Sequence, residues 1–421
     1  MYQETTKQLF TFIKNSPTAF HAVREMGKEL ERAGYQQIRE NDKWNLVPGE
    51  KYYVIRNGSS IIAFHIGEVL EDYGFYVIAS HSDSPMFKIK ENAELEAGKK
   101  YLRLNTEGYG AMICSTWLDR PLSVAGRVIV REKERLQARL VNIDRDLVLI
   151  PNLSIHMNWK VNEGYAYNKQ IDMIPLFGGG ESKKGDFKKL IAAELGVEES
   201  EIYGSDLYVY NRQEPSVWGA NKEFISAPRL DNLQCAYASL QGFLRGSNKK
   251  KIRVYASFDS EEVGSGTRQG AGSTFLHDVL KRVNAGLGKT EEDYYRAIAS
   301  GFMISADNAH AVHPNHPEKT DTENCVYMNE GIVIKSHAGQ KYTSDGMSIA
   351  IFREICERAG VPVQFFSNRS DEIGGSTLGN ISVGKVPINT VDIGLPQLAM
   401  HSAYETAGVR DTEYLIQLGT G

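Results

Sequence analysis

Apolar positions near the start of this 421-residue chain follow two different periods. Between positions 20 and 30 they recur at near-helical spacing, which predicts an amphipathic helix that faces the core, with Ser16 able to cap it. Residues 51–56 and 60–66 instead have the pattern of strands. The Asn57-Gly58 pair between these two runs is a strong turn signal, so the sequence predicts a β-hairpin here.

The middle of the chain, from residue 86 to 221, has short strand-like runs and turns. Residues 122–130 and 136–149 alternate apolar and polar positions, as half-exposed antiparallel strands do. A glycine-rich loop ends at Gly185, and a short helix is expected at 187–195. We therefore predict a separate β-rich domain at 86–221, inserted into a domain that comprises 1–85 plus 222–421.

In that larger domain, strand-like runs alternate with helical ones. Strands are expected at 75–80, 251–257 and 301–306, and helices at 233–240 and 344–359. Strands that alternate with helices are typical of an α/β layer. The fold class that we predict is therefore α/β, with a mixed, largely parallel sheet sandwiched by helices.

Composition and charge narrow the classes of function. The net charge is −5 and the Lys and Arg residues are scattered, so the basic footprint of a nucleic-acid binder is missing. No apolar run approaches the length of a membrane span, and the first residues do not resemble a signal peptide. We expect a cytoplasmic protein with neither nucleic acid nor membrane as a partner.

Cysteine usage limits the kinds of metal site. The four cysteines are far apart and form no Cys-x-x-Cys pair. This spacing argues against a disulfide framework and against a thiolate zinc site. Any metal ion must therefore be held by His, Asp and Glu.

The adjacent carboxylates Glu261 and Glu262 are the first candidates for chemistry. They follow the predicted strand at 251–257. Adjacent side chains on an extended backbone point in opposite directions. One carboxylate could then face a metal ion while its neighbour faces a water or a substrate, as metal-assisted hydrolysis requires. Taken alone, such a pair is more often a solvated loop or helix start.

Other polar residues lie where predicted strands end. His81 is followed by Asp83, as a metal ligand and its carboxylate orienter can be. Asp307 also follows a strand, His401 follows a strand and its connecting turn, and Asp231 opens a helix, where it could instead be an N-cap. In an open α/β sheet such positions face one crevice. Imidazole and carboxylate ligands suit zinc or a similar divalent ion, and one carboxylate can bridge two ions.

Five motifs can be read together: His-Ser-Asp-Ser-Pro at 81, Arg-Leu-Asp-Asn at 229, Asp-Ser-Glu-Glu-Val-Gly-Ser at 259, Asp-Asn-Ala-His-Ala-Val-His-Pro-Asn at 307 and Gln-Leu-Ala-Met-His-Ser at 397. As a set they resemble the aspartyl aminopeptidases, the eighteenth metallopeptidase family. Stretches that begin at Ser16 and Ser115 resemble the same family. The resemblance therefore covers nearly the whole chain.

This resemblance implies two zinc ions, for which cobalt or manganese could substitute. The first ion would be held by His81 and Asp307, and the second by Glu262 and His401, with Asp231 as the bridging ligand. Asp83 would orient His81, and Glu261 would act as general base and acid. A zinc-bound water has a pKa of about 7, and Glu261 can accept its proton and later donate it to the leaving amine.

The resemblance also implies roles in substrate binding and assembly. Lys335, in an apolar strand-like run, would meet the acidic side chain of the substrate, although it could also be a strand-end lysine that reaches solvent. His156 would enter the site of a neighbouring subunit, whereas composition alone favours a partly buried structural histidine. The inserted domain would form homodimers and, through them, a tetrahedral dodecamer.

One turn departs from the family pattern. Many members have Pro-Cys-Gly where this chain has Ile373-Gly374-Gly375. Gly374 and Gly375 are therefore candidates for substrate binding, and the departure leaves the side-chain preference open.

The leading hypothesis is a zinc aminopeptidase that removes N-terminal residues, preferentially Asp or Glu, from peptides. The alternatives are an aminopeptidase for neutral residues such as Leu, a related amide deacylase, and a metal-binding scaffold that has lost catalysis. Glu261 argues against the scaffold, because such a protein has no need of a spare base beside a metal ligand.

Overall fold

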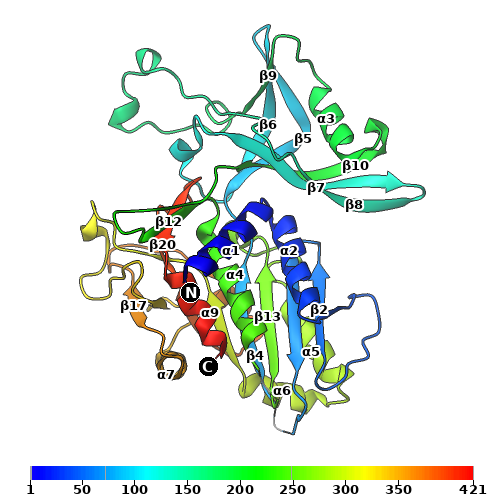
Figure 1. Cartoon of the computed structure of the whole chain (residues 1–421), viewed down its shortest axis with the longest axis vertical. Coiled ribbons are helices and arrows are strands. Elements are labelled where there is room, and N and C mark those ends of the chain that lie inside the picture. Colours follow the sequence, from blue (N-terminus) through cyan, green and yellow to red (C-terminus); the bar gives the residue numbers. More distant parts are fainter. Residues whose placement is uncertain (1, 72, 248, 421) are drawn as a thin grey trace. The chain divides into compact units, whose positions relative to one another are not determined.

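The computed structural model describes residues 2–71, 73–247 and 249–420. Met1, Asp72, Asn248 and Gly421 fall within the predicted domain ranges but lie outside the described residues. The chain divides into two compact units (Figure 1). The first unit comprises Met1–Asp83, Ser216–Met400 and Glu405–Gly421, and the second comprises Ser84–Pro215 and His401–Tyr404.

A central mixed sheet organises the first unit. Its strand order is β1-β2-β3-β13-β4-β14-β18-β16-β17. The strands are β1 (Gln36–Gln37), β2 (Lys51–Arg56), β3 (Ser60–Ile66), β4 (Phe75–His81), β13 (Ile252–Phe258), β14 (Phe302–Ala306), β16 (Ile332–Ser336), β17 (Val363–Ser367) and β18 (Asn389–Gly394). Parallel pairs predominate, and antiparallel pairs occur at β2–β3, β3–β13 and β16–β18. The predicted mixed, largely parallel sheet is confirmed.

Helices cover both faces of this sheet because its strands are apolar on both faces. In β3, Ile61 and Ala63 belong to one core cluster, and Ile62 and Phe64 belong to the other. The first cluster includes residues of α1 (Tyr2–Asn15), α2 (Ala19–Arg32), α4 (Leu230–Arg245), α7 (Gly346–Ala359) and α9 (Asp411–Gln417), and the second includes residues of α5 (Phe275–Gly286), α6 (Glu291–Ala299) and α8 (Leu378–Ser382). Figure 1 shows α1, α2, α4 and α9 of the first cluster in front of the strands. The sandwich is as predicted.

The hairpin expected near the start of the chain is also present. β2 and β3 are antiparallel, and Asn57 and Gly58 have φ angles of 57° and 72°. Such left-handed conformations suit Asn and Gly in a tight hairpin turn. The expected cap at Ser16 is wrong: α2 begins after Thr18, and Ser16 donates its backbone N–H to Ile13 at the end of α1.

The second unit contains an antiparallel sheet with the order β8-β7-β10-β5-β6-β9. Its strands are β5 (Met86–Ala97), β6 (Tyr101–Tyr109), β7 (Leu122–Glu132), β8 (Arg135–Asn142), β9 (Leu176–Gly179) and β10 (Ile202–Asn211). The helix α3 (Asp186–Leu195) contributes Phe187 and Ile191 to the core of this unit. β8 ends earlier than predicted because the chain turns at Arg145, whose N–H bonds to the carbonyl of Ile143.

A small sheet completes the first unit, in the order β11-β12-β20-β19-β15. Its strands are β11 (Ser216–Trp218), β12 (Phe224–Ala227), β15 (Ala309–His310), β19 (Pro396–Leu398) and β20 (Glu405–Gly408). In the part of the chain that the structure describes, no helix is long and apolar enough to cross a bilayer.

Candidate metal centre

The carboxyl ends of three adjacent parallel strands position the centre. β4 lies between β13 and β14, and His81, the last residue of β4, is opposite Phe258 in β13. β14 ends at Ala306, so Asp307 emerges at the same edge of the sheet. These are the positions where open α/β sheets bind ligands.

His81 lies at the middle of a group of carboxylates. Its Nε2 atom is 3.6 Å from Asp231 Oδ1, 3.6 Å from Asp307 Oδ1 and 3.9 Å from Glu261 Oε2. Potential ligand atoms of His81, Glu261 and Asp307 lie within 4.8 Å of one another, and so do those of His81, Asp231 and Glu262. The structure therefore brings together residues that are far apart in the sequence and that were predicted to act together.

Asp83 contacts three members of this group. Its Oδ1 atom lies 3.3 Å from His81 Nδ1. Its carboxylate also accepts the backbone N–H groups of Glu261 and Glu262, each at 3.2 Å. The sequence suggested only the contact with His81; the two backbone contacts were not foreseen.

The backbone of the Glu261-Glu262 pair differs from the prediction. β13 ends at Phe258, Ser260 has a left-handed φ of 67°, and Glu261–Val263 form a short 3-10 helix, so the expected extended backbone is wrong. The two carboxylates nevertheless belong to different ligand groups. Both glutamates follow the left-handed turn at Ser260 and lie in the same 3-10 helix, so strand alternation does not account for their separation.

Burial controls the electrostatics of the group. It raises the pKa of Glu261 to about 8, with Asp307 and Asp83 adding to the rise and His81 opposing it. Burial and the charge of Asp231 raise the pKa of Glu262 well above its usual range. For His81, burial acts to lower the pKa, but contacts with Asp307 and Asp83 raise it overall. Carboxylates packed this closely favour a bound cation, and the imidazole and carboxylate donors fit zinc or a similar ion.

Asp231 is not the N-cap of α4, the alternative role considered for it. Arg229 occupies the cap position, and Asp231 has non-helical angles of φ −80° and ψ 108°. Its backbone N–H donates to Glu405 Oε2 at 2.9 Å. Asp231 is thus held at its own backbone by a buried carboxylate, which sequence reasoning did not identify.

Asn232 ties the segments of Asp231 and Asp307 together. Its side-chain amide donates to the carbonyl of Ala306 at 2.9 Å, and its Oδ1 accepts the N–H of Asn308 at 3.2 Å. Sequence reasoning did not single out Asn232 or Asn308. A usable signal was present, because both Asp231 and Asp307 are followed directly by Asn.

His401 and His156 belong to the second unit. His401 has a φ of 66°, and its carbonyl accepts the N–H of Ile113. His156 lies in the short 3-10 helix Ile155–Met157 and is exposed, so the alternative of a partly buried histidine is wrong. Its ring lies 5.4 Å from that of Trp159. The functional roles of both histidines stay predictions.

Lys335 is buried in β16, with 3% of its surface exposed. Its ammonium donates to the carbonyl of Asp307 at 2.7 Å and to that of Asn308 at 3.2 Å. Burial acts to lower the pKa of Lys335, but the charge of Asp307 and other nearby groups raises it above its usual value. The alternative of a strand-end lysine that reaches solvent is therefore wrong.

Gly374 and Gly375 lie in the exposed segment between β17 and α8. Gly374 has a φ of 66°, in the left-handed region that favours glycine. The ammonium of Lys341 donates to the carbonyls of Ile373 and Gly374 at 2.9 and 3.0 Å. The turn is thus anchored at its backbone, and its role in substrate binding stays a prediction.

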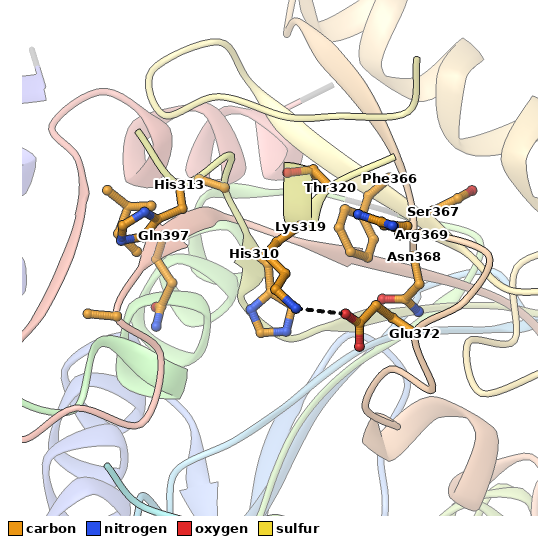
Figure 2. Close-up of a pocket in the computed structure, with 13 residues that line it drawn as sticks. His310, His313, Lys319, Thr320, Phe366, Ser367, Asn368, Arg369, Glu372 and Gln397 are labelled. Carbon is orange, nitrogen blue, oxygen red and sulfur yellow. Dashed lines mark hydrogen bonds and ion pairs between the residues drawn. The ribbon is translucent and has the colours of Figure 1, made fainter. Parts of the chain in front are cut away.

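A cavity of about 260 Å³ lies in the first unit, near the segment that follows Asp307 (Figure 2). Figure 2 shows His310, Phe366 and Gln397 among its lining residues. Lys319 and Glu372 form an ion pair at 3.2 Å across part of its wall. This pairing offsets the positive charge of Lys319, and the aromatic ring of Phe366 adds an apolar surface.

Comparison with known proteins decides the family. The sequence profile of the family described as Aminopeptidase I zinc metalloprotease (M18) matches residues 12–420. The chain belongs to the M18 family. This M18 chain is 47% identical over 414 residues to the probable M18 family aminopeptidase 2 of Clostridium novyi, covering 97% of this chain and 95% of that protein. The predicted zinc-dependent aminopeptidase, a hydrolase and exopeptidase, is confirmed.

Solved structures of similar proteins support the same assignment. The chain resembles one from the cryo-EM structure of the Ape4 and Nbr1 complex, with a TM-score of 0.95, 35% identity and coverage of 99% of this chain and 85% of that one. It also resembles the mApe1 dodecamer of S. cerevisiae, with a TM-score of 0.86, 26% identity and coverage of 99% and 96%. The M18 fold therefore extends over 99% of the chain.

Proposed function

We propose that this M18 aminopeptidase removes an N-terminal residue, by preference Asp or Glu, from peptides at a site that holds two zinc ions. The observation that carries the proposal is the clustering of Asp231, Glu261, Glu262 and Asp307 around His81. In the absence of cations, so many buried carboxylates would repel one another. Two divalent ions would relieve this repulsion.

The ligands would be divided as the family resemblance implies. His81 and Asp307 would hold one ion, Glu262 and His401 the other, and Asp231 would bridge them. Cobalt or manganese could replace zinc, because imidazole and carboxylate ligands accept all three. When bound, the ions would lower the pKa of a water to about 7 and polarise the peptide carbonyl.

The protein's own groups would then move the protons. Glu261 would accept a proton from the attacking water and donate it to the leaving amine. Its position supports this role, because its carboxylate lies 3.9 Å from His81 in the group of potential ligand atoms that also contains Asp307. Asp83 would hold Glu261 in place through the backbone N–H that it accepts.

Lys335 would supply the preference for acidic side chains. The ammonium of Lys335 is buried next to Asp307, in a low-dielectric setting. Its electrostatic attraction to a substrate carboxylate would be stronger there than in water. An ammonium has three N–H donors, and carbonyls of Asp307 and Asn308 receive two of them. A third donor can therefore meet an anion. A neutral-residue preference is the second candidate, because the Gly374-Gly375 turn departs from the family pattern.

Assembly would complete the site. We place His156 in a neighbouring subunit's site, where it would donate a hydrogen bond to the oxyanion of the scissile carbonyl. Leu153, Met157 and Trp159, which surround it in sequence, are large apolar side chains exposed on the second unit. Such a patch is typical of an interaction surface, and homodimers that build a tetrahedral dodecamer would cover it. Mixing inactive His156→Ala subunits with inactive Glu261→Gln subunits should restore activity in the mixed oligomers. No recovery despite confirmed subunit mixing would leave His156 as a structural residue.

A substrate and metal screen tests the proposal. Metal-free protein would be supplied separately with zinc, cobalt and manganese, and assayed on chromogenic Asp, Glu, Leu and Ala substrates. We expect two ions per chain by elemental analysis, reversible loss of activity with a chelator, and faster turnover of the acidic substrates. A faster turnover of Leu would favour the neutral aminopeptidase, and activity without tightly bound metal would reject the two-ion site.

A further inference from the structure

A chain of buried hydrogen bonds runs behind the metal centre. It starts at the backbone N–H of Asp231, which donates to Glu405 Oε2 at 2.9 Å. Glu405 Oε1 accepts from the amide of Gln397 at 3.2 Å, and the Gln397 oxygen accepts from the amide of Asn308. The side chains of Glu405, Gln397 and Asn308, which form this hydrogen-bond chain, are 1–3% exposed. It thus connects the predicted bridging ligand to the residue that follows Asp307.

The far end of this chain has a fixed polarity. Besides its bond to Gln397, the Asn308 amide nitrogen donates to Gln234 Oε1 at 3.0 Å and to the carbonyl of Leu230 at 3.3 Å. Asn308 Oδ1 accepts from the thiol of Cys235. Asn308 therefore presents a donor to Gln397, so the side-chain oxygen of Gln397 accepts this hydrogen bond. The Gln397 amide group then points at Glu405 as a donor.

Position 405 thus faces two donors, the N–H of Asp231 and the amide of Gln397. An ionised carboxylate accepts hydrogen bonds at both oxygens, whereas a carboxamide accepts at only one. A carboxylate is therefore the group that completes the chain.

We infer that Glu405 is a positioning residue of the metal centre: its carboxylate sets the polarity of the hydrogen-bond chain and so fixes Asp231 and the segment of Asp307 for the ions. The inference rests on the proposed function, because it presupposes that these residues bind metal. Partners of this kind, which orient ligands without touching the ion, typically change metal affinity or activity by about 10–100-fold when they are replaced.

The substitution Glu405→Gln tests the polarity directly. It preserves the length and shape of the side chain but replaces one acceptor oxygen with a donor. The new NH2 group at position 405 then faces a second donor, either the amide of Gln397 or the backbone N–H of Asp231. Rotating the Gln397 amide only moves this conflict to Asn308. We expect about 10–100-fold weaker metal binding and a lower kcat with little change in KM.

Exchanging the two side chains should repair the conflict. In the double variant Glu405→Gln with Gln397→Glu, the carboxylate at position 397 accepts from both Asn308 and the new amide. The amide oxygen at position 405 accepts from Asp231. Net charge and side-chain size are unchanged, and the three hydrogen bonds of this chain are restored in the same order. We expect most of the lost affinity and kcat to return.

The probe would be Co²⁺ added to metal-free protein, followed by its visible absorption, with kcat and KM measured on a chromogenic substrate. Glu413→Gln is the matched control, since Glu413 is also buried but contacts the hydroxyl of Thr5. We expect the control to leave Co²⁺ affinity unchanged. If Glu405→Gln does not fold, Gln397→Met removes both bonds of that amide without adding a charge, and should show the same loss.

Unchanged Co²⁺ affinity and kcat in a folded Glu405→Gln protein, or in Gln397→Met, would overturn the inference. A loss of affinity that the exchange variant does not recover would also overturn it. In that case the carboxylate would be needed at position 405 itself, and the polarity of the hydrogen-bond chain would not be the cause. A wild-type protein that binds no Co²⁺ would instead reject the proposed function.

Discussion

The side chain of Asn232 hydrogen-bonds to the backbone on both sides of Asp307. It donates to the carbonyl of Ala306 and accepts the N–H of Asn308. Since Asn232 follows Asp231 directly, the two carboxylates are held at a fixed spacing by one buried amide. The hydrogen bonds of Asn232 involve no side chain that would bind the metal. Asn232 can therefore be replaced without removing a metal ligand.

Replacing Asn232 with Leu should therefore weaken both the fold and the metal site. The apolar side chain has nearly the same size but leaves a buried N–H and a buried carbonyl unsatisfied, at about 1–3 kcal/mol for each group. Urea unfolding would measure the loss of stability, and Co²⁺ titration the loss of affinity. Asn232→Asp keeps an acceptor for the N–H of Asn308. It should therefore lose less stability than Asn232→Leu. A Leu variant as stable as wild type would show that the amide is dispensable.

The adjacent glutamates should separate into a base and a ligand. Glu261→Gln should keep both ions and lose about 10²–10⁴-fold in turnover, the usual worth of general acid–base catalysis. Glu262→Gln should instead weaken metal binding, because the family resemblance makes its carboxylate a metal ligand and Glu261 the base. Elemental analysis and single-substrate kinetics on both variants provide the comparison. Identical behaviour of the two would contradict the assignment.

His21 should make stability depend on pH. It is buried in α2, its Nδ1 lies 2.8 Å from the hydroxyl of Thr18, and burial lowers its pKa to about 3. The unfolded chain binds a proton at His21 near pH 6.5, and the folded protein does not. Above about pH 6.5, His21 is neutral in both states and does not reduce the stability of the fold. As the pH falls from 6.5 towards 3, only the unfolded chain binds the proton, so the free energy of unfolding decreases.

The test compares wild type with His21→Gln, which keeps a polar partner for Thr18 but does not titrate. Both proteins would be metal-free, so that release of ions does not contribute. Urea unfolding between pH 4 and 7 should show a shallower loss of stability in the variant. Equal slopes would mean that His21 is not a source of the pH dependence.

Gly394 allows β18 to approach the carbonyl of Asp307 closely. A Cβ atom added at Gly394 would lie 2.1 Å from that oxygen. Because the obstacle is backbone, Gly394→Ala must displace the Asp307 segment, and we expect a marked fall in metal affinity. Gly346→Ala is the matched control, since a Cβ there meets nothing within 4 Å and the residue begins α7. The control should be neutral or stabilising by up to about 1 kcal/mol. Equal metal affinity in both variants would contradict the close approach.

Much of the centre could be predicted because of one rule about sheets. His81, Glu261 and Asp307 lie at or just beyond the ends of apolar strands, and the carboxyl ends of parallel neighbours meet at one edge. The family resemblance then suggested which residues act together. Local chemistry was sufficient in the hairpin as well, where Asn57 and Gly58 adopt the left-handed angles that their types favour.

The supporting contacts could not be predicted in this way. Glu405 and Asp231 are 174 positions apart, and a buried Glu at the start of a short strand looks like any polar strand residue. The left-handed angle at Ser260 was also hidden, since no glycine marks it. Such features depend on tertiary contacts that no local pattern encodes.

Lys335→Met should reveal whether the buried cation selects acidic substrates. The change keeps the length of the side chain and removes its charge. A charge-assisted contact is worth about 1.5–3 kcal/mol, which is roughly ten- to a hundred-fold in kcat/KM for Asp and Glu substrates. The structure adds a second effect, because Lys335 also bonds to the carbonyls of Asp307 and Asn308. Its loss should lower the rates on every substrate to some extent.

The ratio of Asp to Leu kcat/KM separates these two effects, since the loss of backbone support reduces both substrates alike. We expect this ratio to fall about ten-fold or more in Lys335→Met. Lys51→Met is the matched control, because it removes a half-buried lysine that also donates to a backbone carbonyl, that of Ala33, in a part of the sheet away from the site. The control should leave the ratio unchanged. If Lys335→Met lowers Asp and Leu turnover equally, Lys335 supports the Asp307 segment only, and the acidic preference must come from another residue.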